Sequence, residues 1–220
     1  MRSQRAQRML FPMKDKLTGD LFATDSEDDL RQAAGIDEAG RGPLAGPVFA
    51  AAVILDPVRP IIGLRDSKKL TPAERERLAP IIKERSLAWS IASASVEEID
   101  QFNILQATFL AMKRAVSGLS VTPSLLLIDG NQMPKMPYRI RTVIKGDDTI
   151  AAISAASILA KTAHDALFLQ YAERYPGYGF ESHMGYGTAA HIAAIKQFGV
   201  LPIHRKTFEP IASLLKTNGF

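Results

Sequence analysis

Four carboxylates at three separate places in the chain could together hold a divalent metal ion. Asp37 and Glu38 are adjacent, and Asp129 and Asp147 come much later. Each place follows an apolar run and lies close to a glycine, which is typical of the strand ends where open α/β sheets bind ligands. Carboxylates that converge raise one another's pKa values, and a divalent cation relieves their repulsion. A single strand-end aspartate is more often a turn cap, so the prediction of a metal site depends on the recurrence.

The available ligand types narrow the choice of metal and reaction. The chain has no cysteine, which excludes disulfides, thiolate zinc sites and cysteine nucleophiles. Ligands that are all oxygen favour Mg²⁺ or Mn²⁺ over zinc. Two such ions about 3.5–4 Å apart can activate a water and stabilise the leaving oxygen of a phosphodiester. We therefore expect two ions when substrate is bound.

The stretch Gly35–Pro47 joins the first carboxylate pair to an arginine between glycines. Neighbouring residues on a strand point to opposite faces, so Asp37 and Glu38 can share a ligand only where the strand ends or bends. The glycines permit such a bend and let another backbone approach closely. An arginine held at Arg41 suits a phosphate or a sugar hydroxyl. For the Asp-Glu pair alone, a surface turn with a salt bridge remains the simpler alternative.

Length and composition indicate one folded domain, or one domain plus an appendage. The chain has 220 residues, of which 46% are hydrophobic, and this is enough for a sizeable core. A net charge of +4 is compatible with a polyanionic partner but is weak evidence for one. No apolar run approaches the roughly 20 residues of a membrane span, and no signal-peptide pattern is present. We expect a cytoplasmic protein and take a monomer as the working expectation.

Strands and helices are predicted to alternate along the chain. Apolar runs and period-two patterns predict strands over Ala34–Asp37, Val48–Leu55, Leu87–Val96, Leu125–Asp129 and Arg139–Lys145. Caps and helical periodicity predict helices from Thr71 to about Arg85, from Thr149 to about Tyr175, over Thr188–Phe198 and over Phe208–Thr217. They also predict a helix that follows the Leu87–Val96 strand, has Leu105, Phe109, Met112 and Val116 on one face and is stopped by Gly118. The alternation favours an α/β fold with a mixed sheet.

Residues 1–33 differ from the rest of the chain. A basic block is followed by an acidic block without hydrophobic periodicity, which is typical of a disordered tail. An organelle transit peptide is an alternative, although Met9-Leu10-Phe11-Pro12 makes a poor amphipathic helix. Residues 34–220 are then the folded domain, including helices at the C-terminus.

One face of the predicted long helix is small and polar. Ser154, Ser157, Lys161 and His164 share this face. Ordinary solvent exposure would explain such a stripe, but its closeness in sequence to Asp147 favours the wall of a site.

Five motifs occur together in the order seen in one enzyme family. They are Gly35–Pro47, Asp66–Leu70, Leu127–Asn131, Lys145–Asp147 with Ile153–Lys161, and His183–Thr188. Over about residues 33–213 the chain thereby resembles ribonuclease HII. The resemblance implies an RNase H-like fold, with a five-stranded mixed sheet flanked by helices and a helical C-terminal part. It also implies cleavage of RNA in RNA/DNA hybrids and incision 5′ of a single ribonucleotide in duplex DNA, leaving 3′-hydroxyl and 5′-phosphate ends.

The resemblance also assigns roles to individual residues. It makes the metal-binding, catalytic carboxylates Asp37, Glu38, Asp129 and Asp147. Gly40, Arg41 and Gly42 match the segment that contacts the ribose 2′-hydroxyl and the scissile phosphate. Tyr186 matches the tyrosine that packs on the adjoining deoxyribose, and Lys68 matches a lysine near the active site.

Some acidic and histidine residues fall outside this pattern. We expect Asp148 and Asp165 not to be ligands, and His183, His191 and His204 to pack or to contact phosphate. The family usually has a lysine at the position of Met184 and an arginine at that of His164, so nucleic-acid affinity is expected to differ. The 33-residue leader is too short to be the substrate-binding domain of the related ribonuclease HIII.

Two other functions remain open at this point. Another two-metal nuclease of the same fold, such as a junction resolvase or an exonuclease, would share the carboxylates but not Gly40-Arg41-Gly42. A catalytically silent nucleic-acid-binding module would bind hybrids without cutting them.

Overall fold

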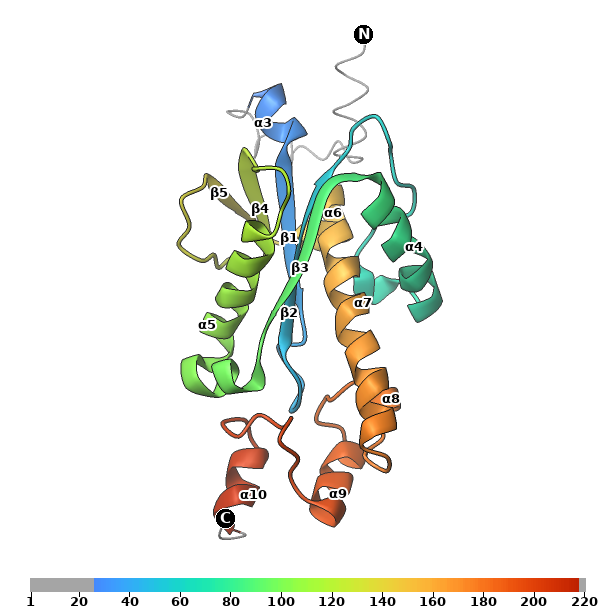
Figure 1. Ribbon diagram of the computed structural model, residues 1–220, viewed down its shortest axis with the longest axis vertical. Coiled ribbons are helices and arrows are strands. Elements are labelled where there is room, and N and C mark those ends of the chain that lie inside the picture. The colour runs from blue at the N-terminus through green and yellow to red at the C-terminus, as the bar shows by residue number, and fades with distance from the viewer. Residues whose placement is uncertain (1–25, 218–220) are drawn as a thin grey trace.

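A computed structural model describes residues 26–217, which form a five-stranded sheet with helices on both faces (Figure 1). The strands are β1 (Ala33–Ala39), β2 (Val48–Leu55), β3 (Ser86–Ala94), β4 (Leu125–Asp129) and β5 (Ile140–Val143). The helices are α3 (Glu27–Arg31), the 3-10 helix η1 (Ser67–Lys69), α4 (Pro72–Arg85), α5 (Val96–Ser117), α6 (Gly146–Thr149), α7 (Ala151–Arg174), α8 (Phe180–His183), α9 (Ala189–Phe198) and α10 (Ile211–Thr217).

The sheet order is β3-β2-β1-β4-β5, with β1 at the centre. It is a mixed sheet, because β1 pairs antiparallel with β2 and parallel with β4, and β4 pairs parallel with β5. This architecture confirms the predicted α/β class.

The helices form one layer on each side of the sheet. In Figure 1, α5 lies on one face, and α7 with α4 lies on the other, while α8, α9 and α10 lie beyond one end of the sheet. Three hydrophobic clusters correspond to these three regions. One lies between the sheet and α4 and α7, one lies between the sheet and α5, and the third joins the C-terminal helices to the end of α7.

Small residues let α7 approach the sheet closely. Its buried face is rich in alanine, including Ala152, Ala155 and Ala156. Opposite them stands Gly35 of β1, where an added Cβ would lie 2.1 Å from the carbonyl carbon of Ala152. Any side chain at this position would push α7 away, so the glycine sets the distance between the central strand and the helix that walls the site.

Most predicted elements are present, with shifted ends. The bounds of β2 and β4 agree with the prediction, and α4 begins with the predicted capping box, in which Thr71 and Glu74 exchange hydrogen bonds. The prediction that Thr149 caps the long helix is wrong. Thr149 ends the separate short helix α6 and donates to the carbonyl of Lys145 (3.1 Å), and α7 begins after Ile150 with no side-chain cap.

Helix α5 follows β3, as predicted, but a break interrupts it. Asn103 has a positive φ of 69° inside the helix. Its side-chain oxygen accepts hydrogen bonds from the backbone N–H groups of Leu105 and Gln106 (3.0 and 3.2 Å). Asn103 thereby caps the second half of the helix, which is the half that the sequence pattern predicted.

The described fold also begins before residue 33. Ser26 caps α3, and Leu30 is buried in the cluster on the α7 side of the sheet. The backbone oxygen of Asp29 accepts from the hydroxyl of Ser124 at 2.6 Å, which ties this helix to the start of β4. The rest of the predicted disordered tail, residues 1–25, lies outside the described residues.

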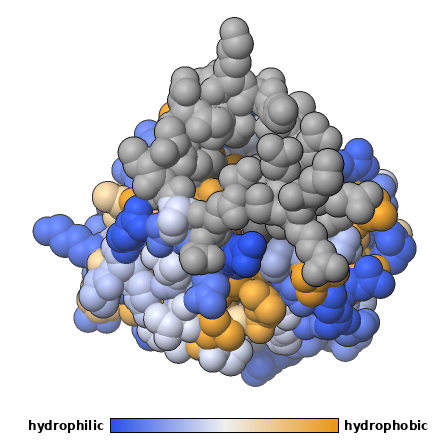
Figure 2. Space-filling model, turned by 90° about the horizontal axis from the view of Figure 1, so that it is seen from above, coloured by the Kyte–Doolittle hydropathy of each residue, from blue (hydrophilic) through white to orange (hydrophobic). Residues whose placement is uncertain are grey.

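In the view from above, hydrophilic residues predominate, with smaller hydrophobic areas between them (Figure 2). None of the helices formed by residues 26–217 is long and apolar enough to cross a membrane.

Candidate active site

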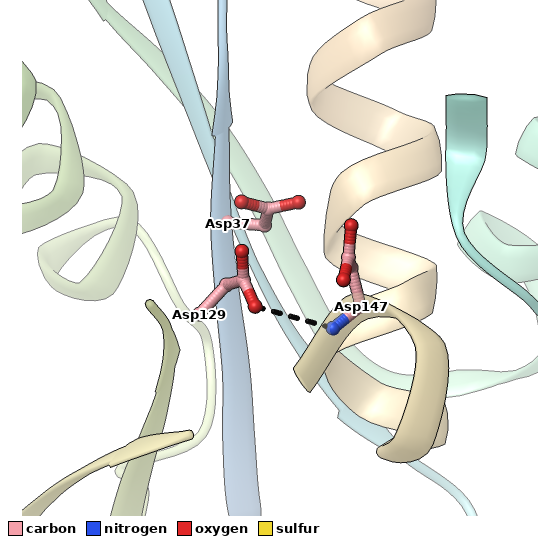
Figure 3. A group of neighbouring side chains, drawn as sticks. All are labelled: Asp37, Asp129 and Asp147. Atoms are coloured by element: carbon pink, nitrogen blue, oxygen red, sulfur yellow. Dashed lines mark hydrogen bonds between the residues drawn. The ribbon is translucent and has the colours of Figure 1, made fainter. Parts of the chain in front are cut away.

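Three of the predicted carboxylates converge beside the central strand (Figure 3). Asp37 lies on β1, Asp129 ends β4, and Asp147 lies in α6. One ligand oxygen from each lies within 4.8 Å of the others. Residues that are 92 and 110 positions away from Asp37 in the chain therefore offer oxygen atoms to a single point.

Strand register brings the first two aspartates together. Parallel strands β1 and β4 are paired up to Ile36 and Ile128. Asp37 and Asp129 come one residue later on each strand, and side chains at matching positions lie on the same face. That face is the one covered by α7, because Leu125 and Leu127 pack in the cluster on that side.

Backbone hydrogen bonds bring the third aspartate to the other two. The Oδ1 atom of Asp129 accepts from the N–H groups of Gly146 (2.7 Å) and Asp147 (3.3 Å), as the dashed line in Figure 3 shows for the latter. The hydroxyl of Ser154 on α7 donates to the backbone oxygen of Asp147 at 2.7 Å. The start of α6 is thus fixed between β4 and α7.

The electrostatics of this group suit a cation. Burial raises the pKa of Asp37 well above its usual value, and the charges of Glu38 and Asp129 raise it further. Burial, together with the charge of Asp129, also raises the pKa of Asp147, to about 6. A divalent ion would relieve the repulsion that adds to the effect of burial. The donor set is all oxygen, which fits Mg²⁺ or Mn²⁺.

Glu38 lies beside this group of three rather than within it. Its Oε1 accepts from Nη1 of Arg41 at 3.2 Å. Burial raises the pKa of Glu38, the nearby Arg41 lowers it, and Asp129 raises it. The salt bridge that a surface turn would have is therefore present. Glu38 is also close to the acidic group. Lys68 lies near the group as well, with its Nζ 3.8 Å from Asp147 Oδ2 and its side chain 79% exposed.

The glycine-rich segment, residues 40–47, lies against Tyr186. Arg41 and Gly42 are exposed, and a Cβ added at Gly42 would lie 3.3 Å from Cε1 of the Tyr186 ring. The backbone N–H of Leu44 donates to the oxygen of Gly185 at 2.7 Å, which joins the two segments. Arg41, Gly42 and Tyr186, which are far apart in the sequence, thus form one exposed surface, while Gly40 beside them is buried.

The polar face of α7 is buried, so it is not an ordinary solvated stripe. Ser154, Ser157 and His164 are each at most 3% exposed. Ser157 hydrogen-bonds to Ser67 of η1 at 2.8 Å and, through a hydrogen bond, lowers the pKa of Asp37. This face forms the predicted wall of the site and links it to the turn that carries Lys68.

The two acids expected not to be ligands have other partners. Asp148 pairs with Lys69 at 2.8 Å. Asp165 accepts from Arg75, Lys161 and His164 at 3.1, 2.7 and 3.0 Å. It thereby connects α4 to α7, and Lys161 in turn lies 5.9 Å from the centre of the Tyr186 ring.

Two residues at which the chain departs from the family pattern lie in the interior or at its edge. His164 is fully buried beneath Gly40, and its Nε2 has no hydrogen-bond partner among the described residues. Met184 ends α8 in the left-handed conformation, with φ of 48°, and packs against the C-terminal cluster. Neither residue replaces a charge at the acidic group.

The other histidines pack together, as one of the two expected alternatives had it. His183 and His191 stack with their ring centres 4.3 Å apart, and Nε2 of His191 lies 3.2 Å from Nε2 of His204. Their remaining nitrogens face backbone groups of the Tyr178–Leu201 region. Tyr178 and Phe180 join this cluster as core residues.

Sequence reasoning missed Arg205. It is 0% exposed and is the largest fully buried side chain of the described residues. Its guanidinium donates to backbone oxygens of the glycine-rich segment more than 150 positions earlier. No spacing rule connects an arginine to carbonyl groups so far away, so the sequence carries no signal for this contact.

Comparison with known proteins decides the family. The sequence model described as Ribonuclease HII matches residues 34–211. The chain belongs to the ribonuclease HII family. It is 62% identical over 187 residues to Ribonuclease HII of Laribacter hongkongensis, covering 84% of this chain and 94% of the relative.

Solved structures agree with this family. The crystal structure of ribonuclease H2 from Pyrococcus horikoshii OT3 matches with a TM-score of 0.71 at 26% identity, covering 84% of this chain and 97% of that one. Bst-RNase HIII in complex with Mn²⁺ matches with a TM-score of 0.63 at 18% identity, covering 85% of this chain and 70% of that one, and shows the shared fold alone. As a ribonuclease HII, the chain is a nuclease of the ribonuclease H class that acts on RNA/DNA hybrids.

Proposed function

We propose that this ribonuclease HII incises duplex DNA on the 5′ side of a single embedded ribonucleotide, and cuts the RNA strand of hybrids, leaving 3′-hydroxyl and 5′-phosphate ends. The observation that carries the proposal is the joint surface of Gly40–Gly42 and Tyr186 beside the acidic group. One part of that surface could bind a ribose while the other packs on the next sugar.

Asp37, Glu38, Asp129 and Asp147 are the proposed ligands of Mg²⁺ or Mn²⁺, with two ions when substrate is bound. Bound there, the ions would supply a water nucleophile at neutral pH and stabilise the leaving oxygen. The raised pKa values of Asp37, Glu38 and Asp147 support this assignment, because the buried carboxylates lack enough positive charge of their own. The Mn²⁺ complex of Bst-RNase HIII is consistent with it.

The exposed cations would hold the phosphate backbone. Arg41 is tethered by Glu38 through Nη1 and is exposed, so its other guanidinium donors remain accessible to a ligand. Lys68 is exposed and close to Asp147. Their charges would orient the phosphate next to the scissile bond, since arginine in particular binds phosphate oxygens in pairs.

Recognition of a single ribonucleotide would depend on its 2′-hydroxyl, because its base pairs like that of a deoxyribonucleotide. The backbone around Gly42 can reach the sugar, because no side chain intervenes. A polar backbone group that is desolvated and left unpaired against a deoxyribose would cost about 1–3 kcal/mol. Backbone contacts at Gly40–Gly42 would therefore discriminate, while Tyr186 would fix the position of the adjoining sugar.

Cleavage-site mapping tests this function. An end-labelled duplex of DNA that carries one ribonucleotide is incubated with the enzyme and Mg²⁺ or Mn²⁺, and the product length gives the position of the nick. We expect a single nick on the 5′ side of the ribonucleotide and a 3′ end that DNA polymerase extends. Replacing the ribose by 2′-deoxy or 2′-O-methyl should abolish the nick.

The same experiment separates the alternatives. Cleavage of branched DNA or of DNA ends, without a ribonucleotide requirement, would favour another two-metal nuclease. Binding without a nick in both metals would favour a silent binding module. The cytoplasmic location, the monomeric state and the assignment of residues 34–220 to one catalytic domain remain predictions.

A further inference from the structure

Arg205 is a buried cation whose hydrogen bonds go to one backbone segment. Its Nε donates to the oxygen of Gly46 at 2.9 Å, its Nη1 to the oxygen of Arg41 at 2.8 Å, and its Nη2 to the oxygen of Gly40. No ion pair of the described residues includes it. Burial lowers the pKa of Arg205 to about 10, so the guanidinium is still charged at neutral pH.

The backbone of Arg205 and of the two residues before it is fixed to the same segment. The N–H of Arg205 donates to the oxygen of Leu44 at 2.8 Å, and the N–H of Gly46 donates to the oxygen of Ile203 at 2.8 Å. Residues Ala45 and His204 also form an isolated bridge. The guanidinium that contacts Gly40 and Arg41 is therefore carried by backbone that hydrogen bonds hold in place.

The geometry of the peptide bond lets these carbonyl contacts fix the direction of the neighbouring N–H groups. In a trans peptide the C=O and N–H bonds point in opposite directions. When Arg205 draws the carbonyls of Gly40 and Arg41 inward, the N–H groups of Arg41 and Gly42 must point away from it. Neither of these N–H groups donates a hydrogen bond within residues 26–217, and both residues are exposed.

We propose that Arg205 is a positioning residue for ribose recognition, which holds the N–H groups of Arg41 and Gly42 outward so that they can donate to substrate oxygens. Arginine suits this role because its rigid, planar group carries five donors, whereas lysine has one compact ammonium. The proposal rests on the proposed function, which assigns ribose contact to Gly40–Gly42.

The test compares Arg205→Lys with Ile195→Ala. The first variant keeps the charge but loses the fork of donors. The second is the matched control, because Ile195 is 2% exposed in the same C-terminal cluster and makes no hydrogen bond to residues 40–47. Both variants should lose stability, and all assays are run well below the lower melting temperature.

The first measurement is made without substrate or metal. Amide hydrogen exchange and ¹H–¹⁵N spectra report on the N–H groups of Arg41 and Gly42. We expect both signals to change in Arg205→Lys and to stay as in the wild type in Ile195→Ala. Equal spectra in the wild type and Arg205→Lys would overturn the proposal, whatever the enzyme cleaves.

The second measurement is the preference for ribose. Binding in EDTA is compared for a duplex with one ribonucleotide and for the same duplex made only of DNA. Loss of two oriented donors should reduce the wild-type preference about tenfold or more in Arg205→Lys, as expected for two ordinary hydrogen bonds. Ile195→Ala should keep it. Equal reductions in the two variants would make Arg205 merely structural.

Two further results are decisive. If the wild type shows no ribose preference and no nick, the proposed function fails, while the amide spectra still decide the orientation by Arg205. If Arg205→Lys is unfolded, Arg205→Gln is tested in the same way, since it retains an amide donor. Failure of both variants to fold would show that Arg205 serves the fold rather than the segment, and would overturn the proposal.

Discussion

Gly42 faces the edge of the Tyr186 ring so closely that a methyl group at Gly42 would lie 3.3 Å from Cε1. Tyr186 is nevertheless 42% exposed, so part of this residue is open to a ligand. Lys161 and His164 border it from α7, at 5.9 and 6.5 Å from the ring centre. Gly42 and Tyr186 therefore form a single contact surface, and a substitution at one should change the position of the other.

Replacing Gly42 by alanine should weaken cleavage without unfolding the protein. The new methyl group would displace the Tyr186 ring by a few tenths of an ångström, because 3.3 Å is tighter than ordinary contact. We expect kcat/KM on the single-ribonucleotide duplex to fall about tenfold, or ~1.4 kcal/mol, with a melting temperature close to that of the wild type.

Gly40→Ala provides the contrast. Gly40 has a positive φ of 88°, and its added Cβ would lie 2.5 Å from Cδ2 of the buried His164. This variant should lose about 2 kcal/mol or more of unfolding free energy through strain and overpacking. A larger loss of stability in Gly42→Ala than in Gly40→Ala, measured by urea unfolding, would contradict the geometry.

Removal of the Tyr186 ring should affect the two substrates differently. Only a junction of ribose and deoxyribose requires the proposed sugar contact, so Tyr186→Ala should reduce kcat/KM about tenfold on the single-ribonucleotide duplex. The loss on a long RNA/DNA hybrid should be smaller. Tyr186→Phe is the control, because it keeps the ring, and it should retain most of the activity. Equal losses on both substrates for Tyr186→Ala would refute the junction role.

Asp129→Asn should abolish cleavage and leave the fold intact. The side-chain oxygen of asparagine can still accept from the N–H groups of Gly146 and Asp147, so α6 keeps its place. The variant removes a charge that raises the pKa values of Asp37 and Asp147. Activity in Mg²⁺ should fall by at least about three orders of magnitude. The melting temperature in EDTA should be unchanged or up to about 3 °C higher.

Asp148→Asn is the matched control for this variant. Asp148 is adjacent to a proposed ligand but pairs with Lys69 on the surface. Its replacement should leave activity within a small factor of the wild type. Near wild-type activity of Asp129→Asn, or its unfolding, would refute the metal assignment.

Because His191 and His204 are buried, we expect the protein to lose stability in acid. Burial lowers the pKa values of His191 and His204 to about 4, from the usual value of about 6.5. As the pH falls from about 6.5 to about 4, the unfolded chain takes up protons that the folded chain does not. The free energy of unfolding should therefore decrease through this window, by on the order of 2–5 kcal/mol for the pair, and should change no further from this source below pH 4.

Asp147 has the opposite effect over part of this window, because its raised pKa favours the folded state as the pH falls from about 6 to 4. Urea unfolding of the wild type and of His204→Asn in EDTA separates the two effects, since Asp147 contributes equally to both proteins. The wild type should lose more stability between pH 6.5 and 4.5. An equal loss in both would show that His204 does not titrate as predicted.

The sequence predicted elements whose signals are local. The continuous apolar run Val48–Leu55 and the capping box at Thr71 each specify one element, and the structure has them at the predicted places. The prediction that Thr149 caps the long helix was wrong because a cap residue is recognised in a sequence by its type alone. Here the preceding Gly146–Thr149 turn forms its own short helix, and Asp129 holds that turn from a distant strand.

The candidate site was predictable where residue type and position sufficed. Asp37 and Asp129 lie on neighbouring strands and Asp147 comes shortly after β5, and the order of the strands brings the three together. Arg205 was not predictable, because its partners are carbonyl groups, which every residue has. The burial of His164 was not predictable from the sequence either, because its neighbours come from β2, the glycine-rich segment and α7.

The dependence of the glycine-rich segment on Arg205 has a consequence for synthesis of the protein. Gly46 and Arg205 are separated by 159 positions. At about 5–20 residues per second, a ribosome needs roughly 8–30 s to add them. During that time the sheet strands β1 to β5 are already made, but the segment lacks the guanidinium that holds its carbonyls. A nascent chain therefore carries the three aspartates before Arg205 can hold the carbonyls of the proposed ribose-binding segment, and translation of the region after β5 is needed to complete that segment.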